Sequence, residues 1–157
     1  MKPLVLYYSY SGNTKQVAEK IHQEIGGDIA RIETVTPYTG DYNTVVNQGK
    51  KEVDQRYHPP IQPIGVDISQ YDTIVLGSPV WWYTYAPAVA SFLEQNSLAG
   101  KKVYPFITDG GWIGHTIKDL QQSCPDALVQ PEIDIYFRAS SMATSQEELS
   151  RWIHQIS

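Results

Sequence analysis

Residues 4–25, LVLYYSYSGNTKQVAEKIHQEI, decide the fold class of this chain. The stretch opens at 4–8 with an apolar and aromatic run that does not alternate, which is typical of a parallel strand covered on both faces. A short polar turn follows. From Asn13 the period becomes helical, and one face of the helix collects Val17, Ala18, Ile21 and Ile25. A strand that passes through a glycine turn into a helix predicts the first half of a βαβ unit.

The rest of the chain repeats this alternation of strand and helix. Further strands are expected at 28–33, 73–77, 101–108 and 127–137, and further helices at about 42–56, 87–99, 113–120 and 145–156. Alternating elements at this spacing predict an α/β fold with an open, doubly wound parallel sheet and helices on both faces. We expect five strands in a single domain that spans residues 1–157.

Composition and charge exclude several classes of protein. The 157 residues carry a formal net charge of -5 and the pI is about 5.3, which disfavours a nucleic-acid partner. The single cysteine, Cys124, allows no internal disulfide. No run approaches the ~18 apolar residues of a membrane span and none resembles a signal peptide, so we expect a cytoplasmic protein without a membrane span. The four histidines lack metal-site spacing, so no metal is expected.

Ligands of open parallel sheets bind outside the carboxyl ends of the strands, where the strand order reverses. This rule selects a first loop at 9–14, a second at 78–85 and a third at 108–112. The first loop, SYSGNT, suits one phosphate: its side chains offer neutral donors, Gly12 lets the backbone approach, and a helix N-terminus follows. Its spacing is neither that of a triphosphate P-loop nor G-x-G-x-x-G. The alternative is an ordinary helix-capping turn.

The second and third loops carry aromatic side chains. Large aromatics at the open edge of a sheet usually have a flat partner, and the second loop supplies Trp81, Trp82, Tyr83 and Tyr85. Alternatively, these rings cover the neighbouring helix. The third loop combines a flexible diglycine with a tryptophan, and its alternative is a glycine turn that seals the core. Together the three loops outline a ligand with one phosphate and a large planar ring. Flavin mononucleotide (FMN) has that shape, and an adenine mononucleotide fits crudely.

These motifs resemble those of flavodoxins over nearly the whole chain: YYSYSGNT at the first loop, YDTIVLGSPVWWYTYAP through the second and T-x-GG at the third. The resemblance implies the strand order 2-1-3-4-5, an FMN cofactor, electron transfer without catalytic side chains, redox partner proteins, and a monomer or weak dimer. It also assigns cofactor-binding residues. The residues implied to bind the phosphate and the start of the ribityl chain are Ser9, Tyr10, Ser11, Gly12, Asn13 and Thr14. Those implied to line one side of the ring are Ser78, Pro79, Val80, Trp81 and Trp82. Those implied to line the other side are Thr108, Asp109, Gly110, Gly111 and Trp112.

Two residues depart from the pattern of the family. Many electron-carrying flavodoxins have a glycine beside the flavin N5 whose peptide flips on one-electron reduction, and VWWYTY supplies none. A flip at Trp82 or Tyr83 would cost ~1–2 kcal/mol for a positive φ. Asp109 stands where this branch more often has serine. A carboxylate near the N1 side would oppose the anionic reduced ring.

Three functions follow as alternatives. The first is a soluble, low-potential FMN electron carrier of flavodoxin type. The second is an FMN-dependent NAD(P)H:quinone or flavin oxidoreductase, because the missing glycine and the aromatic wall favour two-electron chemistry. The third is a regulator without catalysis that signals through a bound flavin or an empty pocket.

Overall fold

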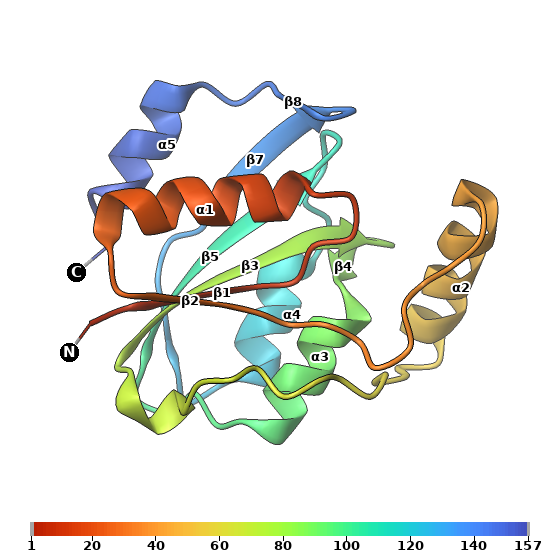
Figure 1. The fold of residues 1–157 in the computed structure, drawn as a ribbon, viewed down its shortest axis with the longest axis horizontal. Helices are drawn as coiled ribbons and strands as arrows, with labels where there is room; N and C mark the ends of the chain where they lie inside the picture. Colours follow the sequence, from red (N-terminus) through yellow and green to blue (C-terminus); the bar gives the residue numbers. More distant parts are fainter. Residues whose placement is uncertain (1, 157) are drawn as a thin grey trace.

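The computed structural model describes residues 2–156, and its centre is a parallel sheet of five strands (Figure 1). These strands are β1 (Leu4–Tyr7), β2 (Asp28–Arg31), β3 (Thr73–Trp81), β5 (Lys102–Asp109) and β7 (Ile133–Arg138). Their order across the sheet is β2-β1-β3-β5-β7, and every neighbouring pair is parallel. Renumbered in chain order this is 2-1-3-4-5, so the predicted topology is confirmed.

Three short strands extend this sheet. β4 (Thr84–Tyr85) pairs antiparallel with the end of β3, β6 (Leu128–Val129) pairs with the start of β5, and β8 (Ser141–Met142) pairs antiparallel with the end of β7. None was expected as a separate strand. The last predicted strand region, 127–137, divides into β6 and β7 because Pro131 lies between them and donates no ladder hydrogen bond.

Helices cover both faces of the sheet. α1 (Asn13–Ile25) and α5 (Gln146–Ile153) lie on one face, and α3 (Pro87–Gln95) and α4 (Thr116–Ser123) on the other (Figure 1). α2 (Tyr42–Asp54) lies beside the carboxyl end of β3 and β4, and a 3-10 turn, η1 (Ile68–Gln70), precedes β3. No helix within residues 2–156 is long and apolar enough to cross a membrane.

The sheet separates two apolar cores. Because successive side chains of a strand point to opposite faces, the fully buried β1 contributes to both. Val5, Val75 and Phe106 face α1 and α5, whereas Leu6 and Leu76 face α3 and α4. This double burial explains why the strands show continuous apolar runs in the sequence.

β3 differs most from its predicted extent. Its expected end at Gly77 is wrong, because the ladder to β5 continues to Pro79, which lies opposite Thr108, and residues 80–81 then pair with β4. The second loop is therefore a β-hairpin and not an open loop. The hairpin holds its aromatic residues on a fixed backbone at the carboxyl edge of the sheet.

Candidate functional site at the carboxyl edge

The first loop forms a tight turn in front of α1. The Oγ of buried Ser9 accepts a hydrogen bond from the Gly12 N–H at 3.1 Å, and Gly12 has a φ of 101°. The N-cap residue of α1, Gly12, makes no side-chain capping bond. The Asn13 N–H lies 3.5 Å from Ser11 Oγ, whereas the N–H groups of Thr14 and Lys15 have no partner among the described residues. A Cβ built on Gly12 meets nothing within 4 Å, so the space beside this turn is open. An uncapped helix end beside open space suits an anion.

The polar side chains at the start of α1 bind other parts of the protein. The hydroxyls of Thr14 and Thr108 lie 2.7 Å apart, and both side chains are almost fully buried. Asn13 donates from Nδ2 to the carbonyl of Ala139, in the turn between β7 and β8, at 2.9 Å. These contacts join the first loop to the third loop and to the β7–β8 turn.

The turn of the second loop has an unusual backbone. Trp82 and Tyr83 are the two residues between β3 and β4, and their φ values are 50° and 72°. Two-residue hairpins of this type normally use asparagine and glycine, because other L-residues at positive φ cost ~1–2 kcal/mol each. The turn is held from both sides: Trp82 Nε1 donates to the Val46 carbonyl of α2 at 2.9 Å, and the Tyr83 carbonyl accepts from the His115 N–H at 2.8 Å.

The close packing around Tyr83 explains why residue 114, just before α4, is a glycine. A Cβ on Gly114, which has a φ of 64°, would lie 2.4 Å from the Tyr83 carbonyl oxygen. Gly114 therefore lets the start of α4 approach the hairpin. Because the chain turns here, α4 begins at Thr116 and not at the expected residue 113.

Trp81 belongs to an aromatic group and is not freely exposed. Its ring lies edge-on to Tyr8, Tyr10 and Tyr38, with centroid distances of 5.9, 6.0 and 4.9 Å. Gly49 of α2 packs against the same ring, since a Cβ there would lie 3.1 Å from Trp81 Cε3. Trp81 thus packs against α2.

Two other residues assigned to the second loop have distinct surroundings. Ser78 is buried and its Oγ accepts a hydrogen bond from the Ala86 N–H at 3.0 Å, so this hydroxyl fixes the chain that enters α3. Val80 lines a hollow of about 370 Å³ with Tyr10, Trp81 and Trp82, and α2 closes its far side. The sequence predicted this helix at about 42–56 but did not place it beside the second loop.

The third loop exposes a tryptophan beside the hairpin. Trp112 is 65% exposed, and its ring centroid lies 4.9 Å from that of Tyr83. Gly111, with a φ of 134°, donates its N–H to Asp109 Oδ1 at 2.8 Å. A Cβ on Gly110 meets nothing within 4 Å, so the space beside this peptide is also open.

The Asp109 carboxyl group is turned toward β7. Oδ1 holds the diglycine turn, whereas Oδ2 is buried without a hydrogen-bond donor among the described residues. The nearby group is the Asp134 carboxyl. Partial burial, a hydrogen bond with Asp109 and the charges of Asp109, Glu132 and Glu148 raise the pKa of Asp134 to about 7. When the Asp134 carboxyl carries a proton, it can donate that proton in a hydrogen bond to the Asp109 carboxylate.

Contacts between side chains bring all three loops together. Thr14 touches Thr108, Tyr10 meets Trp81, and Tyr83 meets Trp112. The predicted residues thus gather at one edge of the sheet. The side chains of Thr14, Ser78, Thr108 and Asp109 already have protein partners there.

The buried threonine pair can be tested by mutation. Thr108→Val should lower the free energy of unfolding by ~1–3 kcal/mol, because it leaves the Thr14 hydroxyl buried without its partner. The double variant Thr14→Val with Thr108→Val should cost less than the sum of the two single changes. Urea denaturation of the cofactor-free protein measures all three, and strictly additive effects would contradict the pairing.

The carboxyl pair predicts a pH dependence of stability. Because the pKa of Asp134 is higher in the folded than in the unfolded chain, the folded state binds the extra proton between pH ~4 and ~7. Its stabilising contribution is present below this window and is lost as the pH rises through it. Asp134→Asn should therefore raise Tm relative to the unmodified protein more at pH 8 than at pH 5. The matched change at exposed Asp126, Asp126→Asn, should show no such trend.

Comparison with known proteins agrees with this geometry. The family model described as Flavodoxin matches residues 2–156. A provisionally assigned flavoprotein of Bacteroides eggerthii is 30% identical, with 99% of this chain and 97% of that chain covered and a TM-score of 0.83. A Lactobacillus acidophilus flavoprotein solved in complex with FMN is 25% identical, with 96% and 97% covered and a TM-score of 0.75.

One of the similar curated proteins is named as an enzyme. The NAD(P)H dehydrogenase (quinone) of Paraburkholderia phymatum is 31% identical over 98 residues, which are 59% of this chain and 45% of that protein. The chain spans less than half the length of the curated relatives it matches. The family match, by contrast, runs through almost every residue. The chain belongs to the flavodoxin family.

Proposed function

We propose that this protein binds FMN at the carboxyl edge of its sheet and serves as a low-potential electron carrier between redox partner proteins of the cytoplasm. The observation that carries the proposal is the meeting of three loops in front of an uncapped helix. The family membership and the FMN complex of the Lactobacillus acidophilus relative support it.

The fit of the site to FMN can be judged from its open positions. Gly12 and Gly110 both border free space, so a ligand can approach the backbone at the two ends of the site. The unpaired N–H groups of Thr14 and Lys15 and the exposed Ser11 hydroxyl would hold the phosphate. The site therefore has hydrogen-bond donors at one end and aromatic side chains at the other.

The remaining assigned residues orient the ring and limit its exposure to water. Val80 and Trp82 would lie on one side and Trp112 on the other, while Ser9, Thr14 and Thr108 hold the loops in place. Bound FMN would supply the acceptance and release of electrons. The side chains need only bind and position it.

A second function is favoured by the hairpin turn. Trp82 and Tyr83 already have positive φ, and bonds to α2 and α4 fix both residues. A turn held in this way has little freedom to change its conformation with the redox state of a cofactor. This geometry, with the quinone-reducing relative, favours an FMN-dependent NAD(P)H:quinone or flavin oxidoreductase.

The phosphate end of the site can be tested with Ser11→Ala. A hydrogen bond to a charged group is worth ~1.5–3 kcal/mol, so FMN affinity should fall about 10- to 100-fold. Riboflavin lacks the phosphate, and its weaker affinity should not change. Tryptophan fluorescence quenching on titration measures both ligands. Equal losses for FMN and riboflavin would place the phosphate elsewhere, and no quenching by FMN would contradict the proposal.

The carrier and the oxidoreductase differ in turnover. The FMN-loaded protein is mixed with NADH or NADPH and a benzoquinone, and the oxidation of the nicotinamide is followed by absorbance. An oxidoreductase should turn over at ~1–1000 per second. A rate below ~1 per minute with both nucleotides contradicts the enzyme and favours the carrier.

A further inference from the structure

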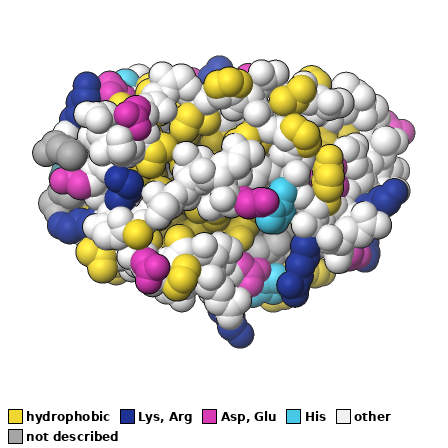
Figure 2. All heavy atoms as spheres, turned by 90° about the horizontal axis from the view of Figure 1, so that it is seen from below, with side chains coloured by type: hydrophobic (Ala, Val, Ile, Leu, Met, Phe, Trp, Pro, Cys, Tyr) yellow, Lys and Arg dark blue, Asp and Glu magenta, His cyan; other side chains and the backbone are white. Residues whose placement is uncertain are grey.

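A second hollow lies on the other side of the β3–β4 hairpin. It measures about 410 Å³ and opens between the end of α2, the start of α3 and α4. Arg56, His58, Tyr85 and His115 are among its lining residues, and none of them belongs to the set assigned to FMN. Figure 2 shows this side of the molecule, where histidine, acidic and basic side chains lie close together.

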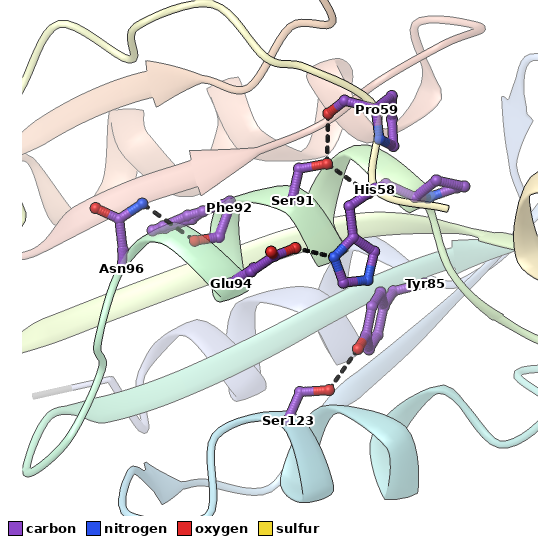
Figure 3. A network of polar contacts seen from close by, with 9 residues as sticks. His58, Pro59, Tyr85, Ser91, Phe92, Glu94, Asn96 and Ser123 are labelled. Atoms are coloured by element: carbon purple, nitrogen blue, oxygen red, sulfur yellow. Dashed lines mark hydrogen bonds and ion pairs between the residues drawn. The ribbon is translucent and has the colours of Figure 1, made fainter. Parts of the chain in front are cut away.

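Each of the two histidines is oriented by a carboxylate. His58, in the segment after α2, contacts Glu94 of α3 through Nδ1, and His115 contacts Asp119 of α4 in the same way (Figure 3 shows the first pair). Asp119 Oδ2 also accepts a hydrogen bond from Thr84 Oγ1 at 2.6 Å. No described residue bonds Nε2 of either ring. A carboxylate on Nδ1 fixes the ring and leaves Nε2 for a ligand.

The acidic groups around the hollow already have partners. Buried Glu52 accepts hydrogen bonds from Tyr38 Oη at 2.6 Å and from Gln48 Nε2 at 3.0 Å. Glu94 and Asp119 hold the histidines. The Arg56 guanidinium, in contrast, has no hydrogen-bond or ion-pair partner within residues 2–156. Arg56 is therefore the charged side chain of the hollow that pairs with no described residue.

The backbone at Arg56 is strained. Its φ is 53°, and the bonds Arg56 N–H to Val53 O (3.1 Å) and Tyr57 N–H to Glu52 O (2.8 Å) end α2 in the pattern that normally uses glycine. A side chain at this position costs ~1 kcal/mol in comparison with glycine. Strain of this kind often marks a functional position.

The hollow also offers flat surfaces. The rings of Tyr57 and Tyr85 line it, and Tyr85 is fixed by a hydrogen bond to Ser123 Oγ at 2.5 Å (Figure 3). Pro87 lines the same wall. A volume of this size is within the ~300–1,000 Å³ of small-molecule sites.

We propose that this hollow binds an aromatic carboxylate. The carboxylate pairs with the planar guanidinium of Arg56, a geometry that arginine favours, and accepts a hydrogen bond from the Nε2–H that an oriented histidine presents when its ring carries both protons. The aromatic ring lies against the tyrosines. Because Thr84 and His115 both border the hollow and hold the hairpin, the occupant touches the back of the turn whose other side faces the proposed FMN site.

The test uses 2-naphthoate as the probe and calorimetry of the full chain as the measurement. 2-Naphthoate should bind with 1:1 stoichiometry, whereas neutral 2-naphthamide and inorganic phosphate should bind at least about tenfold more weakly. Binding should be the same with and without saturating FMN. Equal binding of the amide, equal binding of phosphate, or displacement of 2-naphthoate by FMN would each overturn the proposal.

Arg56→Gly separates binding from folding. Glycine is preferred at this backbone position, so the variant should be at least as stable as the unmodified protein, yet its affinity for 2-naphthoate should fall about tenfold or more. His115→Gln should also weaken binding. Lys118→Gln removes a nearby exposed charge of α4 outside the hollow and should leave binding unchanged. Unchanged binding in Arg56→Gly, or no saturable binding to the unmodified protein, contradicts the site.

Discussion

The parallel pairing of β1, β3 and β5 is the constraint on which every site in this protein depends. Leu6 lies between Ala30 and Leu76 in register, and Leu76 lies opposite Pro105. Because the strands are buried on both faces, a slip of one residue would exchange the two cores and is strongly disfavoured. The same register brings the ends of the three strands to one edge, and there the three loops make contact.

The hairpin depends in turn on elements outside the sheet. Trp82 is held by α2 and Tyr83 by the backbone before α4, so two strained residues are fixed from two sides by segments outside the sheet. Strain persists in a native structure only where its surroundings over-determine it. Gly49 and Gly114 permit this close approach, since a Cβ on either would press on the hairpin. The shape of the site therefore depends on how α2 and the segment before α4 pack against the hairpin.

The sequence predicted the strands and helices well where a period was visible. The run at 4–8 and the helical face from Val17 to Ile25 needed no tertiary information. The hairpin was missed because VWWYTY contains none of the asparagine or glycine residues that normally mark a two-residue turn. The Asp109–Asp134 pair was missed because it joins strands that are far apart in the sequence but adjacent in the sheet.

The site residues show a different limit of sequence reasoning. A serine or threonine in a loop looks the same in the sequence whether its hydroxyl binds a ligand or another part of the chain. Here the hydroxyls of Ser78, Thr14 and Thr108 make hydrogen bonds within the protein. They hold the loops beside the N-terminal turn of α1, where the backbone N–H groups of Thr14 and Lys15 have no partner among the described residues. An anion site built from backbone donors costs no reorganisation when the ligand arrives, because secondary structure already fixes those groups. The hydroxyl-rich loop therefore supports the proposed cofactor through the framework it builds more than through direct contacts.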